Sequence, residues 1–133
     1  MKVIEAIPAL PVRDLDKSAA FYRETLGFSV LHQEGGLVVL GLEQIQVHLW
    51  LANDERWRTE EHWNPVVSGA ETFIAGTGSC RIGLDGVDEM HEKLAPAGII
   101  HPKAPIEDKP WGTREFSVVD PDKNLITYYE WKR

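Results

Sequence analysis

The pattern of hydrophobic and polar residues predicts the same order of strands and helix twice along the chain. In the first half, apolar residues cluster or alternate in four runs that predict strands at residues 3–12, 28–32, 37–40 and 44–51. Between the first two runs, apolar side chains recur at helical spacing and share one face: Leu15, Ala19, Tyr22 and Leu26. The first half is therefore predicted to fold as a βαβββ unit.

Residues that begin or end secondary structure stand at the boundaries of these runs. Asp14 or Asp16 is placed to accept hydrogen bonds from the first turn of the helix, and Gly27 is placed to end it. Pro8 and Pro11 lack the N–H group that a strand ladder needs. We therefore expect the first strand either to lie at a sheet edge or to pair irregularly, and to be loosely held.

The same order returns after residue 78. The pattern predicts a strand, a helix, an extended segment and two final strands at residues 79–85, 87–95, 99–102, 113–119 and 125–131. Residues 120–124, Asp-Pro-Asp-Lys-Asn, have turn chemistry and predict a hairpin between the last two strands. Gly27 and Gly98 end equivalent helices, and Trp50 and Trp131 lie at the ends of equivalent strands, which indicates an internal duplication. We predict an α+β fold of two tandem βαβββ modules, residues 1–51 and 79–133, whose curved mixed sheets enclose a cleft in a single domain.

The segment between the modules, residues 52–78, has no such periodicity. It is charged and aromatic, with Trp57, His62 and Trp63 in its first half and glycines in its second. A loop of this length in a small domain is usually either functional or disordered. Both interpretations stay open for this segment.

Composition and charge narrow the class of partner. The 133 residues, with 43% hydrophobic side chains, suit one compact domain that buries roughly two-thirds of its unfolded surface. The net charge of −7 disfavours nucleic acids and anionic membranes, because phosphate binding needs a basic surface, and it favours a cationic ligand. No apolar run suits a signal or a bilayer-spanning segment, and the single Cys80 excludes an intrachain disulfide. We therefore expect a cytoplasmic protein.

Trp111 is the side chain with the most specific setting. It stands between Pro110, which stiffens the backbone, and Gly112, which frees it, at the mouth of a predicted strand. A large ring at that place is either a lid on the hydrophobic core or a stacking surface for a ligand.

Other reactive residue types have two interpretations each. His48 lies on one face of a strand with Gln46, either as a metal ligand or as a neutral, hydrogen-bonded ring. Cys80 is either a small buried hydrophobic residue or a nucleophile, and the sequence places no base beside it. The paired acids along the chain have no spacing that distinguishes a general acid and base from surface charge.

Several motifs together resemble one known superfamily. Residues 12–22, Leu26-Gly27-Phe28 and residues 120–125 are similar to the vicinal-oxygen-chelate superfamily, which includes glyoxalase I, extradiol dioxygenases, fosfomycin-resistance transferases and bleomycin-resistance proteins. The resemblance covers essentially the whole chain. Residues 110–116, Pro-Trp-Gly-Thr-Arg-Glu-Phe, are most similar to the bleomycin-resistance branch.

The resemblance also implies which residues would hold a catalytic metal, and most of them are replaced. The enzymes use His, Gln or Glu from several strands, but this chain has Thr127 where a Glu is expected and Ser79-Cys80 where a His is expected. The first strand offers only residues 6–8, Ala-Ile-Pro. Gln46 and His48 remain, and two ligands from one strand do not make a catalytic cage. We therefore expect no metal or other cofactor. Of the two alternatives, an enzyme and a non-enzyme, the residues present favour the non-enzyme.

The bleomycin-resistance branch implies a non-catalytic protein that sequesters bleomycin-type glycopeptides. In that branch the first strand crosses to the partner of a homodimer, ligand grooves form between subunits, and the tryptophan of Pro-Trp-Gly stacks on the drug. The implied ligand-binding residues are Trp111, Gly112, His32, Glu34, Leu37, His48, Trp57, Trp63 and Glu115.

Within this set, Glu34 and Glu115 are the candidates for meeting a cationic tail of the drug. The branch often has a second aromatic ring opposite the tryptophan, where this chain has His32, Gly36 and Leu37, so Trp57 or Trp63 would have to replace it. The alternatives are a metal-dependent glyoxalase-, dioxygenase- or transferase-like enzyme and a binding module for another small aromatic metabolite.

Overall fold

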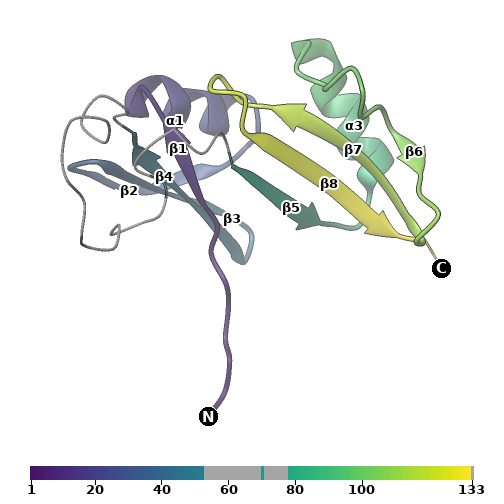
Figure 1. Ribbon diagram of the computed structural model, residues 1–133, viewed down its shortest axis with the longest axis horizontal. Coiled ribbons are helices and arrows are strands. Elements are labelled where there is room, and N and C mark those ends of the chain that lie inside the picture. Colours follow the sequence, from purple (N-terminus) through teal and green to yellow (C-terminus); the bar gives the residue numbers. More distant parts are fainter. Residues whose placement is uncertain (53–69, 71–77, 133) are drawn as a thin grey trace, which may run out of the picture. The chain divides into compact units, whose positions relative to one another are not determined.

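The structure is a computed structural model that describes residues 1–52, 70 and 78–132 (Figure 1). The chain divides into two compact units, Met1–Gly78 and Ser79–Arg133. Each unit is described by itself. Within the described residues no helix is long and apolar enough to cross a bilayer.

The described part of the first unit is a four-stranded mixed sheet with one helix. Its elements are β1 (Ala9–Val12), α1 (Leu15–Glu24), β2 (Ser29–Glu34), β3 (Leu37–Leu42) and β4 (Ile45–Leu51). The strand order is β1-β4-β3-β2, with β1 parallel to β4 and the other pairs antiparallel. The edge position predicted for the first strand is thus confirmed.

The helix of the first unit begins and ends where its local chemistry dictates. The side chain of Asp14 accepts a hydrogen bond from the backbone N–H of Lys17 at 3.0 Å, so Asp14 and not Asp16 caps α1. Gly27, at φ 82°, turns the chain away after the last helical turn. The ring of Tyr22 packs edge-on against Phe28 at 5.8 Å between centroids.

Alternation places the core on one face of the first sheet. The buried hydrophobic residues of β3 and β4 occur at every second position, Val38, Leu40, Val47 and Leu49, whereas in β1 Pro11 is buried as well as Leu10 and Val12. The intervening residues lie on the opposite face, which we call the helix-free face of the first sheet. His48 and Gln46 lie there because Val47 and Leu49 point to the core.

The second unit repeats the topology of the first. Its elements are β5 (Ser79–Gly83), α3 (Val87–Leu94), a short 3-10 helix (Ala95–Ala97), β6 (Glu107–Asp108), β7 (Thr113–Val119) and β8 (Leu125–Trp131). The strand order is β5-β8-β7-β6, with β5 parallel to β8. Two tandem βαβββ modules with mixed sheets were predicted from the repeated pattern, and this prediction is confirmed.

Ring contacts identify which face of the second sheet packs on α3. Phe116 of β7 meets His91 of α3 edge-on at 5.1 Å and stacks on Tyr128 of β8 at 5.4 Å. The carboxylate of Glu130 accepts hydrogen bonds from the first N–H groups of the helix, at Gly86 (3.2 Å) and Val87 (3.0 Å). Even-numbered residues of β7 and β8 therefore face α3, and odd-numbered residues lie on the helix-free face of the second sheet.

The first strand is shorter than the predicted span of residues 3–12. It begins at Ala9, although the carbonyl of Pro8 still accepts a hydrogen bond from His48 N–H at 3.0 Å. Pro8 and Pro11 remove two donors, and residues 1–7 pair with no strand among the described residues. Met1, Val3 and Ile4 are consequently exposed.

Other boundaries differ by a few residues. The second strand runs from Ser29 to Glu34 instead of residues 28–32, and β5 ends at Gly83 instead of residue 85. The two-residue strand β6 was not predicted, and residues 99–102 contribute one isolated bridge, Ile100 to Val118. Most of the segment 52–78, with Trp57 and Trp63, lies outside the described residues.

Candidate functional site

The helix-free face of the second sheet carries a cluster of buried polar side chains. Thr113, Glu115 and Ser117 come from alternate positions of β7, and Thr127 comes from the neighbouring strand β8. Register brings them together, because Ser117 pairs with Thr127 and Glu115 with Tyr129. Buried polar groups are stable only when they are hydrogen-bonded, so their partners decide what this face can do.

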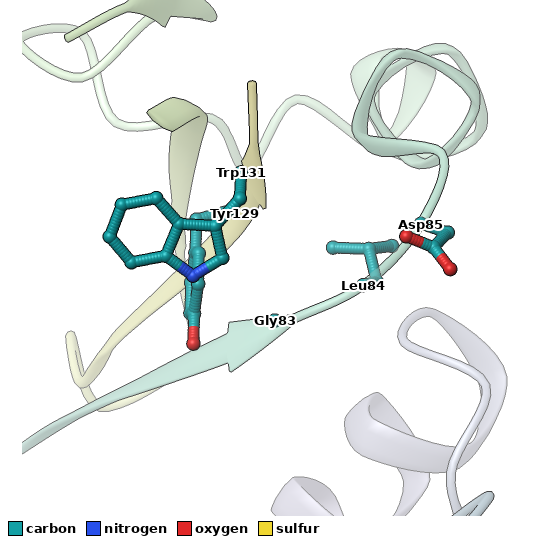
Figure 2. Close-up of a pocket in the computed structure, with 5 residues that line it drawn as sticks. All are labelled: Gly83, Leu84, Asp85, Tyr129 and Trp131. Carbon is teal, nitrogen blue, oxygen red and sulfur yellow. The ribbon is translucent and has the colours of Figure 1, made fainter. Parts of the chain in front are cut away.

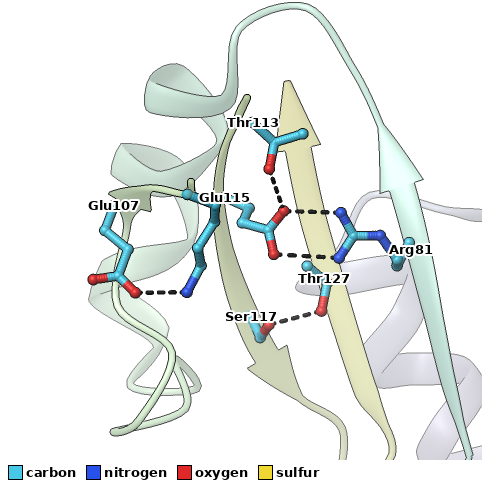
Figure 3. Close-up of polar contacts among 7 residues, drawn as sticks. Arg81, Glu107, Thr113, Glu115, Ser117 and Thr127 are labelled. Carbon is cyan, nitrogen blue, oxygen red and sulfur yellow. Dashed lines mark hydrogen bonds and ion pairs between the residues drawn. The ribbon is translucent and has the colours of Figure 1, made fainter. Parts of the chain in front are cut away.

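Arg81 of β5 holds the carboxylate of Glu115 with two hydrogen bonds (Figure 3). Its Nη1 donates to Oε1 at 3.2 Å and its Nη2 donates to Oε2 at 2.8 Å, while the hydroxyl of Thr113 donates to Oε2 at 2.7 Å. The pKa of Glu115 is lowered, first by the hydrogen bond from Arg81 and further by those from Thr113 and the Trp111 indole, against the opposing effect of burial. Glu115 is therefore an ionised, largely compensated carboxylate.

The second polar pair on this face includes Thr127, at the position where the superfamily resemblance implies a carboxylate metal ligand. The hydroxyl groups of Ser117 and Thr127 are hydrogen-bonded to each other at 2.7 Å. A neutral hydroxyl engaged in this way is a poor ligand for a divalent metal, which prefers carboxylate and imidazole donors. In the part of the chain that the structure describes, no three His, Cys, Asp or Glu residues gather to hold a metal. The donors that the structure describes therefore do not fit the metal centre that the superfamily resemblance implies.

Trp111 lies in a tight turn that precedes β7. Gly112 has φ 101°, a left-handed conformation that favours glycine, and its N–H donates to the carbonyl of Lys109 at 3.1 Å. The Trp111 side chain is 57% exposed, and the ammonium group of Lys109 lies 5.8 Å from its ring centroid. Lys109 is itself paired with Glu107 at 2.6 Å. The ring thus presents accessible aromatic surface beside the polar cluster.

A pocket of about 260 Å³ opens at the ends of β5 and β8 (Figure 2). It is lined by Gly83, Leu84, Asp85, Tyr129 and Trp131. The Tyr129 and Trp131 rings meet edge-on, with centroids 6.3 Å apart and planes at 88°. This pocket belongs wholly to the second unit.

The helix-free face of the first sheet holds the other candidates. Register aligns His32 of β2 with Val39 of β3 and His48 of β4, and aligns Glu34 with Leu37 and Trp50. The Nε2 atom of His32 lies 3.4 Å from Oε2 of Glu34, both exposed, and Nε2 of His48 lies 3.3 Å from Oε1 of Gln46. His48 therefore has a hydrogen-bonding neighbour on its own strand, and Leu37 of β3 pairs with Trp50 of β4.

The predicted site residues thus fall into three groups. Trp111, Gly112 and Glu115 come together in the second unit, and His32, Glu34, Leu37 and His48 lie on one face of the first. Trp57 and Trp63 are outside the described residues. Their joint role in binding stays a prediction.

Sequence reasoning missed Arg81, Asp85 and Tyr129 as parts of a site. Trp131 was noticed only as a marker of the repeat. The available signal was the period of two on each strand, which places Arg81 and Tyr129 on the face of Glu115 once strand register is known. Register between strands distant in sequence is not readable from local pattern.

Cys80 has the surroundings of a structural thiol. Burial, with a smaller contribution from the charge of Asp120, raises the pKa of Cys80 to about 11. A thiol with such a pKa holds almost no thiolate at neutral pH, so it is a weak nucleophile.

Comparison with known proteins covers both units. Residues 6–128 match the model of the Glyoxalase/Bleomycin resistance protein/Dioxygenase superfamily. A bleomycin resistance protein of Geobacillus stearothermophilus is 47% identical over 128 residues, which cover 96% of this chain and 97% of that protein. One of Staphylococcus aureus shows the same identity and coverage. The crystal structure of a bleomycin-binding protein complexed with bleomycin matches with a TM-score of 0.68 at 25% identity, covering 96% of this chain and 98% of the other.

Proposed function

The chain belongs to the Glyoxalase/Bleomycin resistance protein/Dioxygenase superfamily, and from that premise we propose that it binds bleomycin-type glycopeptides and confers resistance by sequestering them. The observation that carries the proposal is the 47% identity with bleomycin resistance proteins along 96% of the chain. The bleomycin-bound relative of the same fold supports a ligand of this class. Sequestration needs tight, stoichiometric binding, about nanomolar or −12 kcal/mol.

Trp111 is the residue we assign to stacking on the flat part of the drug. Trp111 is 57% exposed, and its backbone is held by Pro110 and by the turn at Gly112. A ring held in this way loses little conformational freedom when a ligand stacks on it, which favours affinity. Stacking and apolar burial together contribute roughly 1–3 kcal/mol.

Binding without catalysis is the form of the function that the side chains support. The polar groups on the helix-free face of the second sheet are engaged with one another, as in the Arg81–Glu115 and Ser117–Thr127 pairs. None of these four side chains is arranged as a nucleophile beside a base. These contacts support the proposal that the protein acts by holding its ligand, without chemical change.

Titration calorimetry with bleomycin tests this function directly. We expect saturable binding, an affinity loss of about tenfold or more for Trp111→Ala, and a loss of less than about threefold for Trp111→Phe, which keeps a ring. Glu92→Gln on α3 is the matched control, because this exposed side chain lies on the helix that covers the other face of the sheet. Absence of binding by the wild type, or stoichiometric metal together with turnover of a small substrate, would overturn the proposal.

A homodimer with an exchanged N-terminal segment completes the proposal. Residues 1–7 carry exposed Met1, Val3 and Ile4 and pair with no strand within the described chain, which suits pairing with a second copy. Removal of residues 2–7 is expected to convert a dimer to a monomer in light scattering. If the truncated protein were still a dimer in light scattering, the exchange would be excluded. We place the protein in the cytoplasm, in keeping with a lone, buried and unreactive Cys80.

A further inference from the structure

The pocket at the ends of β5 and β8 has a wall made of two aromatic rings. Tyr129 and Trp131 lie on one side of it, and Leu84 and Asp85 lie on the other (Figure 2). The Tyr129 ring extends over β5 because residue 83 is glycine: a Cβ there would lie 2.8 Å from Cζ and from the hydroxyl oxygen of Tyr129. The faces of such rings carry partial negative charge and attract cations.

The Tyr129 ring already contacts one cationic side chain, that of Arg81. Its guanidinium carbon lies 4.7 Å from the centroid of the Tyr129 ring. The charge of Arg81 is compensated by the two hydrogen bonds to Glu115, so it leaves no net positive charge beside the pocket.

Asp85 supplies the charge that the pocket would need. Its side chain is exposed, and no hydrogen bond or ion pair engages it within the described part of the chain. Glu115, by contrast, is saturated by Arg81 and Thr113. Since Arg81 and Glu115 compensate each other, Asp85 is the charged residue of the pocket lining, and Leu84 lies between it and the two rings in Figure 2.

The Trp131 wall of the pocket lies beside the turn that holds Trp111. A Cβ on Gly112 would lie 3.8 Å from Cζ3 of Trp131, and the N–H of Lys132 donates to the carbonyl of Gly112 at 2.9 Å. The pocket is therefore close enough to this turn to be tested as part of the same ligand site. The volume of about 260 Å³, against roughly 30 Å³ for one water molecule in the liquid, admits a group of several heavy atoms.

We propose that the pocket formed by Asp85, Tyr129 and Trp131 is the subsite for a positively charged alkylammonium or alkylguanidinium group of the ligand. The inference rests on the proposed function and deepens it, since it moves the cation-binding role from Glu34 and Glu115 to Asp85. The carboxylate supplies the ionic contact, and the two rings supply cation–π contacts and exclude water from one side of the charge.

The first experiment is bleomycin titration with Asp85→Asn, which keeps the shape of the side chain and removes its charge. We expect affinity to fall by about fivefold or more, and the loss to shrink as ionic strength rises. Trp131→Ala is expected to weaken binding similarly, while Glu92→Gln, which also removes one negative charge, leaves it within about twofold. If Asp85→Asn stays within about twofold of wild type while Trp111→Ala loses about tenfold, the subsite is wrong and the proposed function stands.

A second experiment does not depend on bleomycin. Amide resonances of the intact protein are followed during titration with n-butylguanidinium and, separately, with n-butylurea, its neutral counterpart. The subsite requires saturable shifts at Gly83, Leu84 and Asp85 with the cation only, and their loss in Asp85→Asn. An equal response to both compounds overturns the subsite, whether or not bleomycin binds.

Discussion

The ion pair of Arg81 and Glu115 allows a quantitative test of what holds the helix-free face of the second sheet together. The Glu115 side chain is only 8% exposed, whereas that of Arg81 is 50% exposed. Removing Arg81 would leave a buried carboxylate that still accepts the hydrogen bond from the hydroxyl of Thr113. An uncompensated buried charge is costly, but the open side of Arg81 lets water approach and reduces that cost.

From this geometry we expect Arg81→Met to lower the free energy of unfolding by about 2 kcal/mol. Glu115→Gln should cost about 1 kcal/mol, because the amide oxygen still accepts hydrogen bonds. The double variant should cost less than the sum, with a coupling energy of about 1–2 kcal/mol measured by urea denaturation. The exposed pair Arg23–Glu24, at 3.3 Å, is the control and should couple by less than about 0.5 kcal/mol.

The pH dependence of the coupling follows from the direction of the pKa shift. The pKa of Glu115 is lowered in the folded state by Arg81, so the stabilisation is present above the unfolded value of about 4.3 and is lost as pH falls through the folded value. The coupling should therefore be constant near neutral pH and decline from about pH 4 downward. A coupling below about 0.5 kcal/mol at pH 7, or one that does not change down to about pH 2, would refute this reasoning.

Three further changes test single features of the second unit. Tyr128→Phe should leave stability unchanged or raise it by about 1 kcal/mol in denaturant titrations, because the buried Tyr128 hydroxyl has no partner among the described residues; a loss of that size would mean it has one. Asp120→Ala should lower the free energy of unfolding by about 2–4 kcal/mol, because the Asp120 carboxylate accepts three hydrogen bonds. The donors are the backbone N–H of Asp122 (2.8 Å) and the backbone N–H and side-chain amide of Asn124 (2.9 Å each). A melting temperature unchanged from wild type would contradict this. With its pKa near 11, native Cys80 should react with iodoacetamide at pH 8 about 100-fold more slowly than in urea, as followed by mass spectrometry; equal rates would show an accessible thiolate.

Local chemistry explains which parts of the fold were predictable from sequence. The hairpin of β7 and β8 was predicted with both strands at their observed bounds, because Asp120 and Asn124 form the turn with their own neighbours. The sequence left two aspartates as candidates for the N-cap of α1, and one hydrogen bond in the structure identifies Asp14 as the cap. In each case the determining partners lie within a few residues in sequence.

Non-local contacts explain what was not predictable. The span of the first strand was overestimated because residues 3–7, which are mostly apolar, have the composition of a strand but pair with no strand inside the described chain. Arg81 and Glu115 are separated by 34 residues in sequence and meet only through the register of β5 with β8 and of β8 with β7. Glu115 could be named as a candidate from its motif, but its partner could not.

The division between engaged and free side chains in the second unit separates stability from affinity. Arg81, Glu115, Ser117 and Thr127 satisfy one another, so changing them removes internal hydrogen bonds and should lower the free energy of unfolding first. Trp111 and Asp85 are exposed, and changing them removes little internal packing. If the polar cluster is a scaffold and the strand ends bind the ligand, the two sets of variants must differ in what they change. Variants of the polar cluster must lower mainly the free energy of unfolding, and variants of Trp111 and Asp85 must lower mainly the affinity for bleomycin. Affinity losses in Arg81→Met that exceed those in Trp111→Ala, at ligand concentrations and temperatures where both variants are fully folded, would show that the polar cluster itself contacts the ligand.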